Sequence, residues 1–254
     1  MNKVYALGFA VFLCLTFSAV GSAQTRTPGV QPGDYFTYNI FATWSSSNPN
    51  ATVPSAFNEF NNTAWYKVSI TAVIDSNVTS TDIWHFKNGT EIPKLVVQDI
   101  ESGTMYYMNG FGGIVGADLN VGDLLHPSGT DNLIVNETVS RSYAGGRRDT
   151  NIVDVTYPLM DSSNNTIGSE RVTYYLDKSV GVLVEMHDEI QYVNPEEKGA
   201  ITWTLKETNR WVVSAHELSL PLPLPILLVI IAAIIAVIAF AFFFKHRRTR
   251  KKRR

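Results

Sequence analysis

The chain has 254 residues and a formal charge of −2, a near-neutral average that hides a strong asymmetry. Nine of the 21 basic residues lie outside the segment 24–217, which leaves that segment 12 basic residues against all 23 acidic ones and a net charge of −11. An acidic domain does not neutralise phosphates, so these numbers exclude nucleic acid as a partner. The segment is long enough for one ordinary domain with a conventional core.

Residues 1–23 have the pattern of a signal peptide. A short positive start is followed by the mostly apolar stretch Val4–Val20, and Gly21-Ser22-Ala23 offers small residues for cleavage. The apolar stretch could instead remain as a first membrane span. The only cysteine, Cys14, lies within it, so a cleaved chain has no disulfide, no thiolate metal site and no cysteine nucleophile.

The segment 24–217 shows the two-residue period of β-strands. Along Trp65–Asp75 the apolar residues alternate with polar ones, and only Val73 breaks the alternation. The side chains predicted on one face are Tyr66, Val68, Ile70, Ala72 and Ile74. Similar strands are predicted at Ile152–Tyr157, Arg171–Leu176, Val182–His187 and Ile201–Leu205.

Turn-forming residues separate these strands. Asn88-Gly89, after a strand containing Trp84 and Phe86, suits a tight hairpin. Further turns are predicted at Gly145-Gly146, Asp161–Gly168, Asp177–Gly181 and Asn194–Gly199. Val53–Asn62 could form one short helix or a surface loop. We therefore expect an all-β extracellular domain at 24–217, an antiparallel meander that forms a twisted sheet, a half-barrel or a sandwich.

No catalytic or metal-binding motif is found in this domain. His187-Asp188-Glu189 cannot converge on one metal, because alternate strand residues point to opposite faces. Gly110–Gly116 lacks the spacing of a phosphate-binding loop. Asp118–Asp123 resembles the start of a calcium loop, but its glycine comes one residue early and Gly129 stands where the bidentate acid belongs. We expect a turn there, with weak calcium binding as an alternative. We predict no cofactor and no catalytic residue.

Aromatic residues and glycosylation sequons are the remaining candidates. The aromatic residues mostly suit core packing, but in an open half-barrel some would line an apolar groove. The groove candidates are Trp65, Tyr66, Trp84, Tyr174 and Trp203. Six Asn-x-Ser/Thr acceptors for N-glycosylation lie between the two hydrophobic ends, at Asn50, Asn61, Asn77, Asn88, Asn136 and Asn164.

The carboxyl-terminal part is predicted to anchor the chain in a membrane. Residues 218–225 alternate leucine and proline toward their end, which favours an extended spacer. Residues 226–244 are built only from Ile, Leu, Val, Ala and Phe, and 19 residues at ~1.5 Å each span roughly 28 Å, about the hydrocarbon core of a bilayer. Eight basic residues in the tail 245–254 place it in the cytoplasm and beside anionic lipids, so the amino terminus lies outside.

Three short segments resemble parts of uncharacterised archaeal single-pass surface proteins. They are Val30–Tyr38, Asp118–Asp123 and Tyr174–Glu185. The resemblance implies a β-rich exterior domain with one carboxyl-terminal span, and it implies no catalytic residues. The Asp177–Gly181 hairpin also looks like hairpins of lipoprotein-carrier half-barrels, which is an analogy of fold alone.

Three classes of function remain at this point. We expect a membrane-anchored, non-enzymatic cell-surface module that binds an extracellular protein, a glycan or another envelope component. The first alternative is a half-barrel that binds a lipid or another apolar ligand. The second is a secreted hydrolase, which a cluster of perturbed acidic residues in a cleft would favour.

Overall fold

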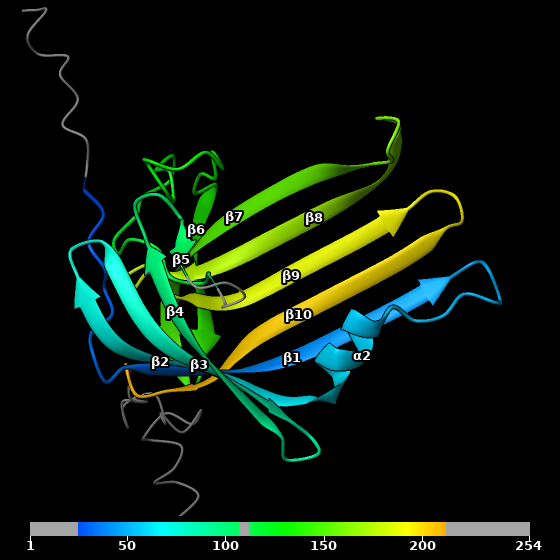
Figure 1. The fold of residues 1–254 in the computed structure, drawn as a ribbon. Coiled ribbons are helices and arrows are strands. Elements are labelled where there is room, and N and C mark those ends of the chain that lie inside the picture. The colour runs from blue at the N-terminus through cyan, green and yellow to red at the C-terminus, as the bar shows by residue number, and fades with distance from the viewer. Residues whose placement is uncertain (1–24, 107–111, 212–254) are drawn as a thin grey trace, which may run out of the picture. The chain divides into compact units, whose positions relative to one another are not determined.

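A computed structural model describes residues 25–106 and 112–211, and Figure 1 shows their fold. Within these ranges the chain forms ten strands and one helix. In chain order the elements are β1 (Tyr35–Ser46), α2 (Ser55–Asn62), β2 (Thr63–Ile74), β3 (Asn77–Phe86), β4 (Glu91–Asp99), β5 (Met105–Tyr106), β6 (Glu137–Tyr143), β7 (Gly146–Met160), β8 (Thr166–Asp177), β9 (Leu183–Tyr192) and β10 (Glu197–Thr208).

All described strands belong to one antiparallel sheet in the order β5-β4-β3-β2-β1-β10-β9-β8-β7-β6. Strands β1–β5 and β6–β10 form two meanders, and the first and last strands join them, with Phe36 opposite Thr208 and Ser46 opposite Glu197. The predicted antiparallel, all-β architecture is confirmed. The sheet is open, because its edges β5 and β6 do not pair, and a single sheet is not the sandwich that the sequence also allowed.

A β-bulge explains the break in the alternation of β2. Ile70 pairs with Ser80, but the next partners are Ala72 with Thr79 and Val73 with Val78, so the register shifts by one residue. The shift turns Val73 toward the core and leaves Ile74 67% exposed. Ile74 was predicted on the buried face, and the bulge is the physical reason that it lies on the other one.

Each predicted turn contains the connection between two strands, although Gly146, Gly168 and Gly199 belong to the strands that follow, and the undecided segment Val53–Asn62 contains a helix. Gly89 has a φ of +86°, and the N–H of Phe86 donates to the carbonyl of Thr90 to close the β3–β4 turn. Helix α2 carries Phe57 and Phe60 three positions apart, so both side chains reach the same face. The short helix is therefore amphipathic and packs on the sheet.

Helix α2 covers the face of the sheet that we call the inner face, which carries Tyr38, Tyr66 and Trp203. Phe57 packs on Trp44 of β1 with ring centroids 5.4 Å apart. A Cβ on Gly199 of β10 would come within 2.5 Å of the Phe57 ring, so the glycine makes room for the helix. The opposite side of the sheet is called the outer face.

The chain between β5 and β6 covers another part of the inner face. Its residues Leu119, Leu125 and Val135 pack on Val153 of β7 and Leu183 of β9 in a second core cluster. Backbone hydrogen bonds of 2.7 Å, from the N–H of residue 115 to the carbonyl of residue 181 and from residue 183 to residue 113, tie this segment to the β8–β9 turn. Nε2 of Gln98 on β4 donates to the carbonyl of residue 114 at 2.8 Å, so the described part of the segment, residues 112–136, contacts both halves of the sheet.

Four predicted segments lie outside the described residues: the signal peptide 1–23, the spacer 218–225, the membrane span 226–244 and the tail 245–254. Within the ranges 25–106 and 112–211, the structure has no helix with the length and apolar character needed to cross a membrane.

Candidate functional site

Three of the five residues predicted to line an apolar groove pack against one another in the core. The ring centroid of Trp203 lies 5.1 Å from that of Tyr66 and 6.1 Å from that of Trp84. Phe60 of α2 stacks on Trp84 at 5.8 Å and meets the edge of Trp203 at 6.4 Å. Only 2% of Tyr66 and 6% of Trp203 remain exposed, so the helix fills the space that a ligand would need.

The other two predicted groove residues lie elsewhere. Trp65 precedes Tyr66 on β2 and therefore faces the opposite side of the sheet, where its ring stacks on His85 at 4.5 Å. Tyr174 packs against the second core cluster, under the segment 112–136. The structure does not join the five side chains into one groove, because strand alternation and the two core clusters separate them.

A polar recess of about 420 Å³ lies on the outer face of β6–β9, and we call it the outer groove. Its position follows from alternation, since every second residue of a strand points to the same face. The residues that line it are Glu137, Ile152, Asp154, Arg171, Thr173, Tyr175, His187 and Glu189.

Glu185 organises one end of the outer groove from a buried position. Its Oε2 accepts a 2.6 Å hydrogen bond from the Tyr143 hydroxyl and pairs with Nη2 of Arg141 at 2.8 Å. Its Oε1 lies 2.6 Å from Nε2 of His187. Burial, followed by the hydrogen bond to Glu185, raises the pKa of Tyr143 far above its ordinary value. Tyr143 therefore remains a neutral donor, and one carboxylate holds three side chains in place.

An arginine–aspartate pair lies in the lining of the outer groove and is exposed to solvent. Arg171 donates to both oxygens of Asp154, from Nε at 3.0 Å and from Nη2 at 2.5 Å. These hydrogen bonds hold the pKa of Asp154 below its usual range, so the carboxylate stays charged. Beside the pair, the guanidinium of Arg141 lies 4.3 Å from the ring centre of Tyr175, in a cation–π contact. The groove thus has polar groups that are already oriented.

Two carboxylates of the outer groove are open to a ligand. Glu137 and Glu189 are both exposed, and neither accepts a hydrogen bond from a side chain in the described ranges. Thr173 adds a hydroxyl whose bond to Asp154 is long, at 3.4 Å. The groove therefore offers free acceptors next to oriented donors, which is the pattern that a ligand with many hydroxyl groups requires.

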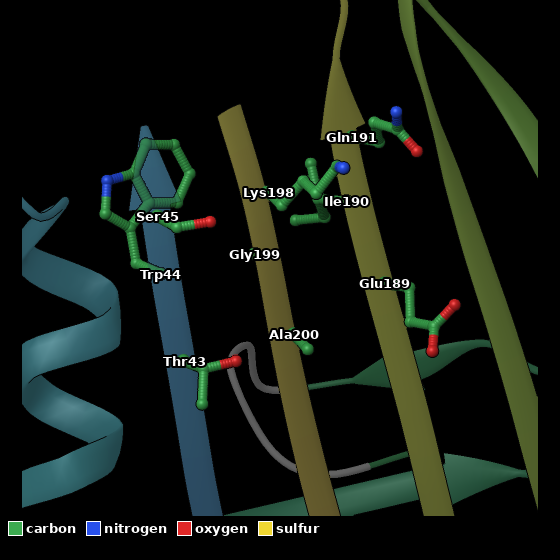
Figure 2. Close-up of a pocket in the computed structure, with 9 residues that line it drawn as sticks. All are labelled: Thr43, Trp44, Ser45, Glu189, Ile190, Gln191, Lys198, Gly199 and Ala200. Atoms are coloured by element: carbon green, nitrogen blue, oxygen red, sulfur yellow. The ribbon is translucent and has the colours of Figure 1, made fainter. Parts of the chain in front are cut away.

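A second recess, of about 260 Å³, lies at the far end of β1, β10 and β9. Figure 2 shows the indole of Trp44 turned toward α2, with Glu189 and Gln191 turned away from it. The full lining is Thr43, Trp44, Ser45, Glu189, Ile190, Gln191, Lys198, Gly199 and Ala200. Strand register places the side chains of Thr43, Ser45, Glu189, Gln191, Lys198 and Ala200 on one face of the sheet, whereas Trp44 points to the other face and packs on Phe57 there.

Two acidic residues on neighbouring strands meet on the inner face. Asp188 of β9 lies opposite Val172 of β8, next to Glu170. Burial, then the charge and hydrogen bond of Glu170, raise the pKa of Asp188 to about 6. Oδ1 of Asp188 is shielded from solvent and has no hydrogen-bond partner within the described residues. As predicted, Asp188 points away from its sequence neighbours His187 and Glu189, which line the outer groove.

The sequons occupy different environments. Asn50, Asn88, Asn136 and Asn164 are exposed, whereas Asn61 and Asn77 are half-buried. The segment Asp118–Asp123 forms a turn, as predicted, in which Oδ2 of Asp123 accepts a 2.8 Å hydrogen bond from the N–H of Asn120. No set of three His, Cys, Asp or Glu side chains within residues 25–106 and 112–211 is placed to hold a metal ion.

Reasoning from the sequence missed the outer groove. A signal existed in the polar side of the predicted strand Arg171–Leu176, where Arg171, Thr173 and Tyr175 share a face. Its partners come from other strands, and Tyr143 and Glu185 are 42 residues apart. No local spacing indicates that they meet.

Comparisons with known proteins leave the function to be argued from the chain itself. No protein-family model and no curated protein matches it. Among solved structures, the chain is similar to a protein from Parabacteroides distasonis ATCC 8503 described as a putative lipoprotein, with 9% sequence identity and a TM-score of 0.37. The similarity covers 73% of this chain and 99% of that chain. A TM-score below 0.5 does not establish a shared fold.

Proposed function

We propose that the chain is a membrane-anchored, non-enzymatic cell-surface module whose β domain binds an envelope glycan through the outer groove. The observation that carries the proposal is the oriented polar lining of that groove, in which Arg171 and Asp154 hold each other and Glu185, outside the lining, holds His187. A site whose groups are already held in place loses little conformational freedom on binding, which favours affinity.

The chemistry of the lining favours a polar ligand over a lipid. An apolar chain seated on Arg171, Asp154 and Glu189 would remove these charges from water without replacing their hydrogen bonds, which is unfavourable. Sugar hydroxyls both donate and accept, so they match carboxylates and an arginine that lie side by side. The volume of about 420 Å³ is in the range of sites for small ligands.

A lipid carrier is less well supported by the same structure. Helix α2 packs on Trp84 and Trp203 of its groove, Tyr66 and Trp203 are almost fully buried, and Trp65 and Tyr174 lie elsewhere. A carrier would have to move the helix and open a packed aromatic core. The loss of several contacts between aromatic rings, each worth about 0.5–1.5 kcal/mol beyond the buried area, opposes that movement.

We assign no hydrolysis to the acidic pair on the inner face. A glycosidase needs its two carboxyl groups roughly 5–9.5 Å apart, so that the sugar, with or without a water, fits between them. Asp188 and Glu170 lie two register positions apart on adjacent strands, and neither of them lines either of the two recesses described above. In our proposal the pair tunes stability.

The proposed location depends on the two ends of the chain. The apolar run 226–244 and the basic tail 245–254 support an anchor with the tail in the cytoplasm, and the acidic segment 24–217 then lies outside. Protease treatment of intact cells that carry a tag on the tail checks this arrangement. The expected product is a protected, tagged fragment of the anchor, and protection of the whole chain would contradict the proposal.

Glycan binding is tested with the full chain in lipid nanodiscs on an array of bacterial and archaeal envelope glycans. The groove variants are Glu189→Gln and Thr173→Val, and the control is Glu196→Gln on the β9–β10 turn, which lies outside the groove lining. We expect the groove variants to weaken binding to the selected glycan by about tenfold each, the effect of one or two hydrogen bonds. Equal binding by all variants would reject the groove as the site.

A further inference from the structure

Asn136 lies at the edge of the outer groove. The next residue, Glu137, lines the groove, and the N–H of Asp154, another lining residue, donates a 2.7 Å hydrogen bond to Oδ1 of Asn136. The backbone N–H of Asn136 in turn donates to the carbonyl of Ile152 at 2.8 Å. Asn136 is exposed, so this sequon is fixed to β7 and open to solvent at the groove.

The side-chain nitrogen of Asn136 is free for modification. No described residue accepts a hydrogen bond from its Nδ2, and the fixed contact of the side chain uses Oδ1 alone. A sugar linked to Nδ2 would make a secondary amide, which keeps its oxygen as an acceptor. Glycosylation at Asn136 is therefore compatible with the folded structure.

Asn61 presents the opposite case. Its Oδ1 accepts from the N–H of Ala42 at 3.0 Å, and its Nδ2 donates to the carbonyl of the same residue at 2.8 Å. This pairing needs an N–H on the same side as the oxygen. A secondary amide prefers the trans form, in which the remaining N–H points away from the oxygen, and the cis form costs about 2.5 kcal/mol. A glycan on Asn61 would break the pairing that holds the end of α2 to β1.

We infer that Asn136 carries an N-linked glycan at the rim of the outer groove that restricts access to the groove, whereas Asn61 stays unmodified. The inference rests on the proposed function for the exterior location of the domain. Because Oδ1 of Asn136 accepts from the backbone N–H of Asp154, a lining residue, the glycan would start at the edge of the groove.

The first test maps the glycans on the full chain purified from the membranes of a host in which Asn88 and Asn164 are modified. These two exposed sequons on turns serve as internal positive controls. Mass spectrometry of the peptides is expected to show a glycan on Asn136 and none on Asn61. An unmodified Asn136, or a modified Asn61 in folded protein, overturns the inference.

The second test measures access to the groove without any ligand. Thr173→Cys, in a chain whose only cysteine is replaced by Cys14→Ser, places one thiol in the groove. We compare its rate of reaction with a maleimide linked to polyethylene glycol in three backgrounds. Thr138→Ser keeps the sequon, whereas Asn136→Asp and Thr138→Val both remove it, and Asn136→Asp retains the acceptor for the N–H of Asp154.

Both removals are expected to raise the labelling rate several-fold over the Thr138→Ser background. A control thiol at Glu196→Cys, on the β9–β10 turn, should react at the same rate in all three. Equal rates for the Thr173→Cys thiol would overturn the role of the glycan. The labelling needs no ligand, so the two proposals can fail separately. If both removals speed up labelling but the chain binds no glycan on the array, this inference stands and only the proposed function is rejected.

Discussion

Tyr143 of β6 and Glu185 of β9 are joined by a 2.6 Å hydrogen bond, although β7 and β8 lie between their strands in the sheet. Adjacent strands are about 4.8 Å apart, so a flat sheet would hold the two strands too far from each other for a tyrosine to reach. The end of the β6–β7 hairpin must therefore curl toward β9. That curl buries the carboxylate of Glu185.

Replacing Tyr143 by phenylalanine should destabilise the domain by about 1–2 kcal/mol, because a buried carboxylate loses one of its three donors. The measurement is thermal unfolding followed by tryptophan fluorescence, and for a domain of this size we expect a fall in Tm of about 2–8 °C. Tyr192→Phe is the matched control, since no described residue bonds to its hydroxyl. An equal effect of the two substitutions would show that the hydrogen bond contributes nothing.

Asp188 should contribute more to the stability of the domain in acid than at neutral pH. Its pKa in the folded chain is raised to about 6 by burial and by Glu170, above the value of about 3.8 in the unfolded chain. The folded state therefore holds the proton more tightly. The stabilisation is complete below about pH 4 and is lost as the pH rises through 6.

The size of this effect is about 1 kcal/mol, after a discount for the part of Asp188 that solvent screens. Asp188→Asn should remove this contribution, so that it raises the Tm at pH 7 and leaves the Tm at pH 4 almost unchanged. Glu189→Gln, on the same strand but on the opposite face, is the control. If Asp188→Asn instead lowers the Tm at pH 7, the raised pKa assigned to Asp188 is wrong.

The strands were predictable from the sequence wherever one face of a strand is buried and the other is exposed to solvent. Along Trp65–Asp75 the period of two identified β2, and the irregular Val73 marked the bulge that the structure shows there. The pairing of β1 with β10 was not predictable, because it joins Phe36 to Thr208 and no local signal records a contact of that length. For the same reason, the sequence did not predict that the sheet stays open with β5 and β6 at its edges.

The candidate site was less predictable than the fold. Counting aromatic residues suggested a groove, but Trp65 and Tyr66 are neighbours on one strand and so lie on opposite faces. Helix α2, which fills the remaining space, was one of two options for its segment. The outer groove depends on register across four strands, and register requires knowing which strands pair.

Gly199 should be sensitive to any side chain, because a Cβ there would come within 2.5 Å of the ring of Phe57. Gly199→Ala is expected to lower the free energy of unfolding by about 1–3 kcal/mol through overpacking. Phe57→Leu removes the far end of the ring, so the double variant should lose less stability than the sum of the two single variants. Strictly additive losses in urea unfolding would show that helix and strand do not meet at this point.

Arg148 and Asp177 form a buried pair whose two ends are not equivalent. Arg148 donates to Asp177 from Nε at 2.5 Å and from Nη2 at 3.0 Å, and the carboxylate, which is 1% exposed, also accepts from the N–H of Val180 in the β8–β9 turn. Breaking a buried pair leaves an uncompensated charge, which costs about 3–5 kcal/mol. Arg148→Met should therefore destabilise the domain by about 3 kcal/mol.

The reason for this loss can be separated from packing with a second substitution. Adding Asp177→Asn to Arg148→Met removes the stranded charge while an amide oxygen can still accept from Val180, so urea unfolding should recover about 1 kcal/mol or more. Arg148→Lys should recover less, because a lysine cannot reproduce the two-pronged contact. A double variant that is less stable than Arg148→Met alone would contradict this explanation. It would show that the Asp177 carboxylate stabilises the turn chiefly through Val180, and that its unpaired charge costs little free energy.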